Sequence, residues 1–83
     1  MSLYQLEREG EVEELKSVIR TTDNPEVKAR AAGILGDFDE ETLDGHDVVT
    51  PLVDLAQSAD DDRVTAAAID ALNQLGTDAM EEL

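Results

Sequence analysis

The chain has 83 residues and carries 21 acidic against six basic side chains, so its net charge is −15. A chain of this size buries only about 60% of the surface that it exposes when unfolded, which leaves little room for a catalytic cleft. Its charge repels nucleic-acid phosphates and anionic membranes, so we expect neither as a partner. It has no cysteine and one histidine, which excludes a disulfide framework, a thiolate nucleophile and a histidine-rich metal centre.

Composition also indicates where the protein works. The N-terminus lacks the basic and then apolar run of an export signal, and no apolar stretch approaches the roughly 20 residues that span a bilayer, so we expect a cytoplasmic protein. Leu, Ile, Val and Phe make up about a quarter of the residues, above the range of disordered acidic chains. The excess of carboxylates and the scarcity of lysine resemble proteins of salt-accumulating archaea; the alternative is an ordinary acidic protein. At molar salt the Debye length is about 3 Å, which quenches the repulsion among these charges.

The chain opens with a short predicted helix over residues 2–9. Ser2 is a suitable N-cap, and Gly10 ends the helix before the chain continues. We expect this segment to cover the following helices as an N-terminal cap through its apolar residues Leu3, Tyr4 and Leu6.

The main feature of the sequence is a repeat with a constant offset of 37 residues. Residues 23–38 align with residues 60–75 so that apolar positions coincide at helical spacing: Val27 with Val64, Ala31 with Ala68, Ala32 with Ile69, Ile34 with Ala71, Leu35 with Leu72, and Phe38 with Leu75. The segments before them obey the same shift, with Val12, Leu15, Val18 and Ile19 falling on Val49, Leu52, Leu55 and Ala56. Each unit is therefore predicted to be a hairpin of two amphipathic helices.

We predict a single domain over residues 1–83. Its parts are a capping helix at 2–9, a first repeat at 11–38, an acidic inserted loop at 39–46, a second repeat at 47–76 and the start of a truncated third repeat at 77–83. The third repeat is inferred because Met80–Leu83 is similar to Val12–Leu15. The inserted loop explains why the interval from Val12 to Val49 is longer than the interval from Val49 to Met80.

Residues typical of helix ends fit this division. The segment Asp23–Pro25 supplies a polar cap and a proline suited to a first turn, and the acidic run at 60–62 supplies a cap for the last helix. Gly36 and Gly76 are predicted to terminate the second helix of each repeat. Pro51 leaves the start of its helix uncertain by several residues.

Residues 24–36 resemble the second helix of the HEAT-repeat superfamily, in the short prokaryotic form called the PBS-lyase HEAT-like repeat. The matching elements are Asn24–Pro25, Val27–Lys28, Ala31–Ala32 and Leu35–Gly36. Residues 61–75 are a weaker copy, with Asp62 in place of the proline and Asn73 in place of the closing glycine. The resemblance implies an all-α fold, an α-solenoid fragment of two HEAT-like helical hairpins, and the acidic composition makes it similar to a haloarchaeal member.

The resemblance also implies that first helices lie outside and second helices line a concave surface. About three such units are normally needed for stability, so two are marginal. We expect the chain to be the front end of a longer solenoid. The alternatives are that residues 77–83 fold back, or that the open C-terminal face pairs with another molecule, including a second copy of the chain.

The exposed positions of the second helices are the candidate protein-binding residues. They form a stripe at helical spacing and comprise Glu26, Arg30, Gly33, Asp37, Arg63, Ala67, Asp70 and Gln74. Arg30 and Arg63 are rare cations in an acidic chain and can pair with a partner's carboxylates. The alternative is a solvated face with an intrahelical Glu26–Arg30 pair. Gly33 in mid-helix indicates the close approach of a neighbouring helix or a partner.

The segment 37–47 concentrates carboxylates beside the one histidine, His46. A calcium loop is excluded, because the sixth and twelfth positions are not glycine and glutamate. Metal binding by His46 with Asp44 or Asp47 is the weaker alternative to a solvent-facing insert, so we expect no metal. The apolar residues expected to hold this insert against the helices are Phe38 and Leu43.

The sequence contains no catalytic triad, phosphate loop or dinucleotide fingerprint. We therefore expect no enzyme and no cofactor, and predict a non-catalytic protein–protein interaction module, a scaffold or adaptor adapted to high salt. The alternative raised by the resemblance is an accessory subunit similar to the bilin (phycocyanobilin) lyase proteins, which handles a chromophore or small molecule. Repeat resemblance alone does not transfer catalysis.

Overall fold

Helices form all the regular structure of residues 2–76, the part of the chain that the computed structural model describes. In chain order they are α1 (Leu3–Glu9), α2 (Val12–Thr21), α3 (Pro25–Asp37), α4 (Glu40–Leu43), α5 (Val49–Ser58) and α6 (Asp62–Gln74). The pair α5 and α6 reproduces α2 and α3 at the predicted shift of 37 residues. The predicted all-α fold of two helical hairpins after a short opening helix is confirmed, while the third repeat predicted at 77–83 lies outside the described residues.

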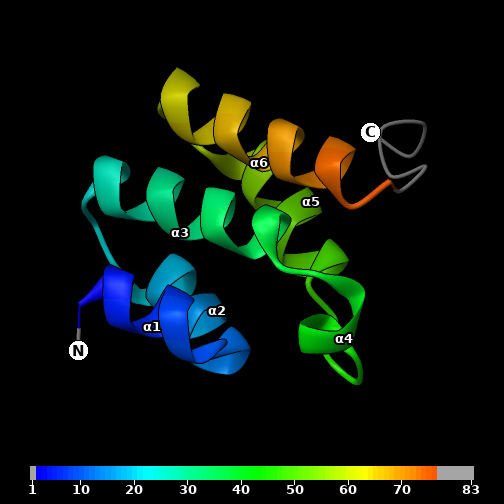
Figure 1. Cartoon of the computed structure of the whole chain (residues 1–83). Helices are drawn as coiled ribbons and strands as arrows, with labels where there is room; N and C mark the ends of the chain where they lie inside the picture. Colours follow the sequence, from blue (N-terminus) through cyan, green and yellow to red (C-terminus); the bar gives the residue numbers. More distant parts are fainter. Residues whose placement is uncertain (1, 77–83) are drawn as a thin grey trace.

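The helices are arranged in two layers (Figure 1). The second helices of the repeats, α3 and α6, lie side by side and run in the same direction. Behind them, α2 packs against α3, and α5 packs against α6. The opening helix α1 contacts both α2 and α3, so it extends the layer of α3 and α6 on the side away from α6.

The core between the layers consists of residues that the repeat pairs. Leu15 and Leu52 on the first helices, and Leu35 and Leu72 on the second helices, are all fully buried. Within residues 2–76 no polar or charged side chain is buried, so the burial of apolar surface is the main stabilising contribution. The apolar periodicity along the sequence therefore predicts the positions of the large core residues.

One repeat pair differs in burial. Val64 on α6 is buried, whereas its counterpart Val27 on α3 is only half-buried. The reason lies in the neighbours: α6 has the 13-residue α3 beside it, whereas α3 has only the seven-residue α1 on its other side. The N-terminal part of α3, where Val27 lies, is therefore less completely covered than the corresponding part of α6.

Gly36 lies at a close contact between α3 and α6. The helix continues through it to Asp37, so the prediction that Gly36 terminates the helix is wrong. A Cβ atom at Gly36 would lie 2.6 Å from the Cα and 2.7 Å from the Cβ of Ala71. Glycine is required here because no side chain fits between the two helices. Gly76, by contrast, follows α6 with a φ of +67°, as expected of a glycine after a helix.

Polar side chains cap the helices where the sequence predicts caps. The Asn24 Oδ1 accepts hydrogen bonds from two N–H groups of the first turn of α3, at 2.9 and 3.4 Å, and Pro25 follows it directly. The Asp61 Oδ1 accepts the N–H two residues further on, at 2.8 Å, and so begins α6. The sequence leaves the start of α5 open, and the structure begins this helix at Val49. Pro51 therefore lies in the first turn, where its missing N–H is not needed.

The acidic insert at 39–46 is more ordered than the predicted loop, because it contains the one-turn helix α4. Asp39 caps this turn by accepting a backbone N–H at 2.8 Å. Phe38 and Leu43 are half-buried and pack against the core, so the prediction that they hold the insert against the helices is confirmed.

Candidate protein-binding face

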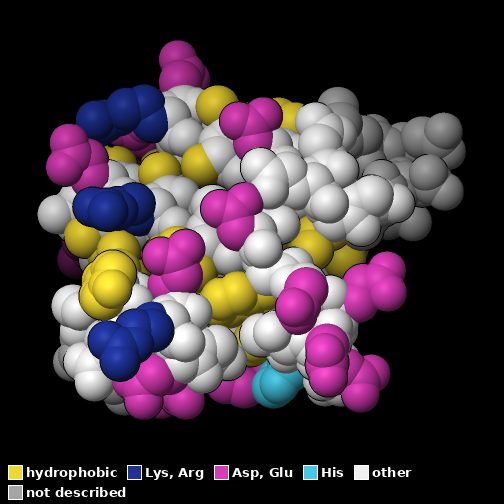
Figure 2. Space-filling model, in the orientation of Figure 1, with side chains coloured by type: hydrophobic (Ala, Val, Ile, Leu, Met, Phe, Trp, Pro, Cys, Tyr) yellow, Lys and Arg dark blue, Asp and Glu magenta, His cyan; other side chains and the backbone are white. Residues whose placement is uncertain are grey.

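The eight predicted site residues come from α3 and α6. We call the exposed side of α1, α3 and α6 the front face; it is the side seen in Figure 2. Six of the predicted residues are exposed, and Gly33 and Ala67 are half-buried. Residues three or four apart share one side of a helix, which explains why each helix contributes a row. The rows are Glu26, Arg30, Gly33 and Asp37 on α3, and Arg63, Ala67, Asp70 and Gln74 on α6.

Arg63 connects the two rows. Its Nη1 lies 3.6 Å from the Glu26 Oε1 on α3, and its Nη2 lies 3.1 Å from the Asp61 Oδ2. Hydrogen bonds from the Arg63 side chain and then from its backbone N–H lower the pKa of Asp61. Glu26 thus pairs across the helices, and the intrahelical pair with Arg30, which belongs to the alternative of a solvated face, is not formed. Exposed pairs of this kind contribute little stability, so their importance lies in placing the guanidinium.

Basic side chains form a column over α6, α3 and α1 at one end of the front face (Figure 2). Arg63 is the one basic residue of α6, and Arg8 is the one basic residue of α1. Arg30 on α3 lies between them: it lines one depression with Glu26 and Arg63, and a second one with Tyr4. Within residues 2–76 neither Arg8 nor Arg30 forms an ion pair.

Tyr4 is the one large apolar side chain that is exposed in the described part of the chain, with 69% of its surface accessible. The prediction that Tyr4 helps to cover the first repeat is wrong. Leu6 is buried and Leu3 half-buried, so these two residues occupy the side of α1 that faces the core. Tyr4 shares the opposite side of α1 with Arg8, and together they line a depression there. The spacing of four residues between them is the signal that sequence reasoning missed.

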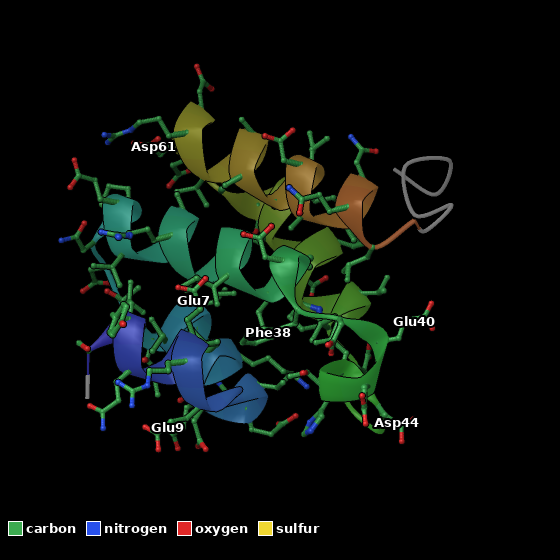
Figure 3. All side chains as sticks on the ribbon, in the orientation of Figure 1. Glu7, Glu9, Phe38, Glu40, Asp44 and Asp61 are labelled. Carbon is green, nitrogen blue, oxygen red and sulfur yellow. The ribbon has the colours of Figure 1, made fainter. Side chains whose placement is uncertain are left out.

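Carboxylates gather at the other end of the front face. Figure 3 shows Glu40 and Asp44 pointing outward around α4, away from the start of α6, where Asp61 is labelled. The basic side chains of the front face thus lie toward the N-terminal ends of α3 and α6, where carboxylates accompany them, whereas the region beyond the C-terminal ends of these helices shows carboxylates without basic neighbours (Figures 1 and 2). A binding partner would meet cations at one end only.

His46 holds the acidic insert against the first repeat. Its Nδ1 lies 2.8 Å from the Glu13 Oε2 on α2, and the Lys16 Nζ lies 3.2 Å from the same oxygen. Hydrogen bonds from His46 and then from Lys16 lower the pKa of Glu13. Within residues 2–76 no three His, Asp or Glu side chains are grouped in a way that could hold a metal ion. The contact with Glu13 was not found by sequence reasoning, because 33 residues separate the two side chains.

Gly33 lies beside the depression between α1 and α3. A Cβ atom added there would meet no atom within 4 Å, so the prediction that a neighbouring helix comes close to Gly33 is wrong. Ala67 packs against the core, and Asp70 and Gln74 are exposed further along α6. The two glycines of α3 thus differ: Gly36 permits a helix contact, and Gly33 borders open space.

The described residues offer no enclosed polar site. None of the polar side chains in residues 2–76 is buried, and the Ser58 hydroxyl donates to the carbonyl of Asp54 in its own helix, at 2.6 Å. In this same part of the chain, every helix is too short or too polar to cross a membrane.

Comparison with known proteins agrees with the architecture. A family model for HEAT repeats matches residues 12–83. The chain is 49% identical over 73 residues, 88% of its length, to a HEAT repeat-containing taxis protein of Halobacterium salinarum, and it spans 17% of that relative's length. No solved structure matches the chain. The family match covers all the paired helices, and the chain belongs to the HEAT-repeat family.

Proposed function

We propose that this chain is a non-catalytic protein-interaction module that presents its front face to a partner protein rich in carboxylates. HEAT repeats commonly mediate contacts between proteins, because stacked helices present extended surfaces. The haloarchaeal relative is named a taxis protein, and we place this module in the same process. We also propose that the repeat is of the short prokaryotic type, with the capping proline at Pro25, and that residues 77–83 begin a third repeat.

The observation that carries the proposal is the column of Arg8, Arg30 and Arg63 with Tyr4 exposed among them. Carboxylates outnumber basic residues 21 to six in this chain, yet Arg8 and Arg30 have no ion-pair partner within residues 2–76. Arginine and tyrosine are enriched among residues that dominate binding energy at protein interfaces. A guanidinium binds a carboxylate through two parallel hydrogen bonds, so a partner with exposed carboxylates complements this column.

High salt makes contact between two acidic proteins feasible. In dilute buffer the net charge of −15 would repel an acidic partner over tens of ångströms. At molar salt the Debye length is about 3 Å, so long-range repulsion disappears and ion pairs at contact distance keep part of their attraction. We therefore place the module in the cytoplasm of a salt-accumulating haloarchaeon, with its front face as the docking surface.

The test is affinity capture from native lysate at molar salt. The variant Arg30→Gln with Arg63→Gln removes two cations from the front face. A matched control, Gln57→Glu with Asn73→Asp, changes the net charge by the same amount at exposed positions outside the predicted stripe. We expect wild type and control to retain a stoichiometric protein partner and the Arg30/Arg63 variant to lose it, with unchanged circular dichroism for all three.

Two outcomes would count against the proposal. Capture that survives the loss of Arg30 and Arg63 would show that the partner binds elsewhere. A co-purifying pigment or small molecule, without a stoichiometric protein, would favour the chromophore-handling alternative. Light scattering on the purified chain separates a third case, in which the partner is a second copy of the same chain.

A further inference from the structure

The remaining three basic residues line a groove on the back layer. Lys16 and Arg20 come from α2 and Lys28 from the first turns of α3, and the opposite wall is α5, with Pro51 and Leu55. The groove exists because α2 packs against α3 and α5 packs against α6, which leaves a gap between the two first helices. Its volume is about 420 Å³, which suits the side chains of a short peptide segment.

The cations of this groove are largely unused within the chain. Lys16 contacts Glu13 at 3.2 Å, but Arg20 and Lys28 form no ion pair within residues 2–76. Asp54 is the one carboxylate among the residues that line the groove. The lining itself thus holds a local excess of positive charge, which favours a negatively charged occupant at contact distance, while Asp23, Asp60 and Asp61 line the adjoining depression beside Lys28.

The spacing of the side chains along each wall of the groove matches the spacing of side chains in an extended peptide. Lys16 and Arg20 are four residues apart on α2, which separates them by about 6 Å along the helix, and Pro51 and Leu55 have the same separation on α5. In an extended strand, alternate residues lie roughly 6.5 Å apart and point to the same side, while successive residues point to opposite sides. One row of side chains can therefore follow the cations of α2 while the other follows Pro51 and Leu55 on α5, whose remaining groove residues are polar.

We propose that the groove between α2 and α5 binds an extended segment of a partner protein in which carboxylates alternate with apolar residues. Lys16 and Arg20 receive successive carboxylates, and Lys28 neutralises a further one at the end of the groove near the start of α3. The apolar residues of the segment cover half-buried Pro51 and the small accessible edges of Ile19 and Leu55, which otherwise belong to the core. This second site is independent of the partner that the front face takes.

A synthetic peptide tests the proposal on the full 83-residue chain. The probe is a fluorescent, blocked octapeptide of alternating glutamate and valine, and its control has the same composition with four valines followed by four glutamates. Fluorescence anisotropy measures affinity at low and at molar salt, and amide NMR shifts locate the bound peptide. We expect saturable binding of the alternating peptide, weaker but measurable at molar salt, with shifts confined to α2, α5 and the start of α3.

Matched variants assign the binding to the groove. Arg20→Gln with Lys28→Gln should weaken binding of the alternating peptide at least tenfold. Gln57→Glu with Asn73→Asp makes the same change of net charge at exposed positions outside both the groove and the front-face column, and should leave the affinity unchanged. Both pairs are solvent-accessible positions, and circular dichroism verifies that the variants fold.

Several results would overturn this proposal. One is that the control peptide, with four valines followed by four glutamates, binds as tightly as the alternating peptide. Another is that both variants lose the same affinity. The others are amide shifts on the front face and the absence of saturable binding even at low salt. Displacement of the peptide by inorganic phosphate, but not by chloride at equal ionic strength, would identify the groove as a site for small anions instead. Shifts on the front face would instead assign the peptide to the arginine column of the first proposal, and the other outcomes do not bear on the lysate experiment, so the two proposals fail separately.

Discussion

Replacement of Gly36 by alanine tests the packing of the two repeats most directly. The residue lies in α3 at the contact with α6, and alanine would place a methyl group 2.6 Å from the Ala71 Cα. Optimal contacts between carbon atoms are about 3.5–4.0 Å, so the two helices would have to separate by roughly 1 Å. The obstacle is backbone and cannot rotate away, and the separation would also loosen the contacts of Leu35 and Leu72.

Gly33 provides the matched control three residues earlier on the same helix. Alanine is favoured over glycine inside a helix by about 1 kcal/mol, and at Gly33 the added methyl group meets nothing within 4 Å. We expect Gly33→Ala to raise the free energy of unfolding by about 0.5–1 kcal/mol. At Gly36 overpacking costs about 1–3 kcal/mol, and the propensity gain of about 1 kcal/mol offsets part of this cost, so Gly36→Ala should lower the free energy of unfolding by up to about 2 kcal/mol.

Urea denaturation followed by circular dichroism at molar salt measures both variants, because urea leaves the ionic strength unchanged. The decisive result is that the free energy of unfolding rises for Gly33→Ala and falls for Gly36→Ala. Both variants carry the same gain in helix propensity, so the difference between them reports the contact with α6. If Gly36→Ala were as stable as Gly33→Ala, the close contact between α3 and α6 would be absent and the packing described above would be wrong.

Three further predictions follow from the core and the charges. Leu35→Ala and Leu72→Ala should each lower the free energy of unfolding by about 2–5 kcal/mol, enough to unfold much of the population. The exposed control Tyr4→Ala should change it by less than about 0.5 kcal/mol. If either leucine variant were as stable as the wild type in urea, the placement of that leucine in the core would be wrong. The melting temperature should rise from dilute buffer to molar salt, and a flat or falling curve would contradict adaptation to high salt. At molar salt the melting temperature should fall as the pH drops below about 4. Hydrogen bonds in the folded state lower the pKa of Asp47 and Asp61, so the stability that they add is present above their unfolded pKa and is lost as they are protonated. A melting temperature that stays level between pH 5 and pH 3 would show that these carboxylates do not stabilise the fold.

The repeat could be predicted from sequence because burial acts on each unit in the same way. Leu15 and Leu35 must face the interior of the first hairpin, and the same requirement places Leu52 and Leu72 at a constant distance along the chain. Caps obey local rules as well: Asn24 accepts N–H groups of its own helix, so neighbours in sequence suffice to predict it. Periodicity and local chemistry therefore establish the elements and most of the core.

The remaining errors concern which helix lies next to which side chain. Gly36 and Gly33 look equivalent in sequence, and only the position of α6 makes one a contact and the other exposed. Tyr4 is apolar by type, but the core-facing side of α1 is already occupied by its leucines. The contact of His46 with Glu13 depends on how the insert folds across the first repeat. Each of these depends on a distance between elements, which helical periodicity does not encode.

The placement of the six basic residues gives the charge pattern a functional interpretation. If they served mainly to offset the chain's own carboxylates, most would form ion pairs, because carboxylates surround them. Within residues 2–76 only Lys16 and Arg63 do so. The others divide between the front face, with Arg8 and Arg30, and the back groove, with Arg20 and Lys28. Under the proposed binding at molar salt, these cations would act only at contact distance, so they would give nearly no long-range attraction and would favour partners whose carboxylates fit against them.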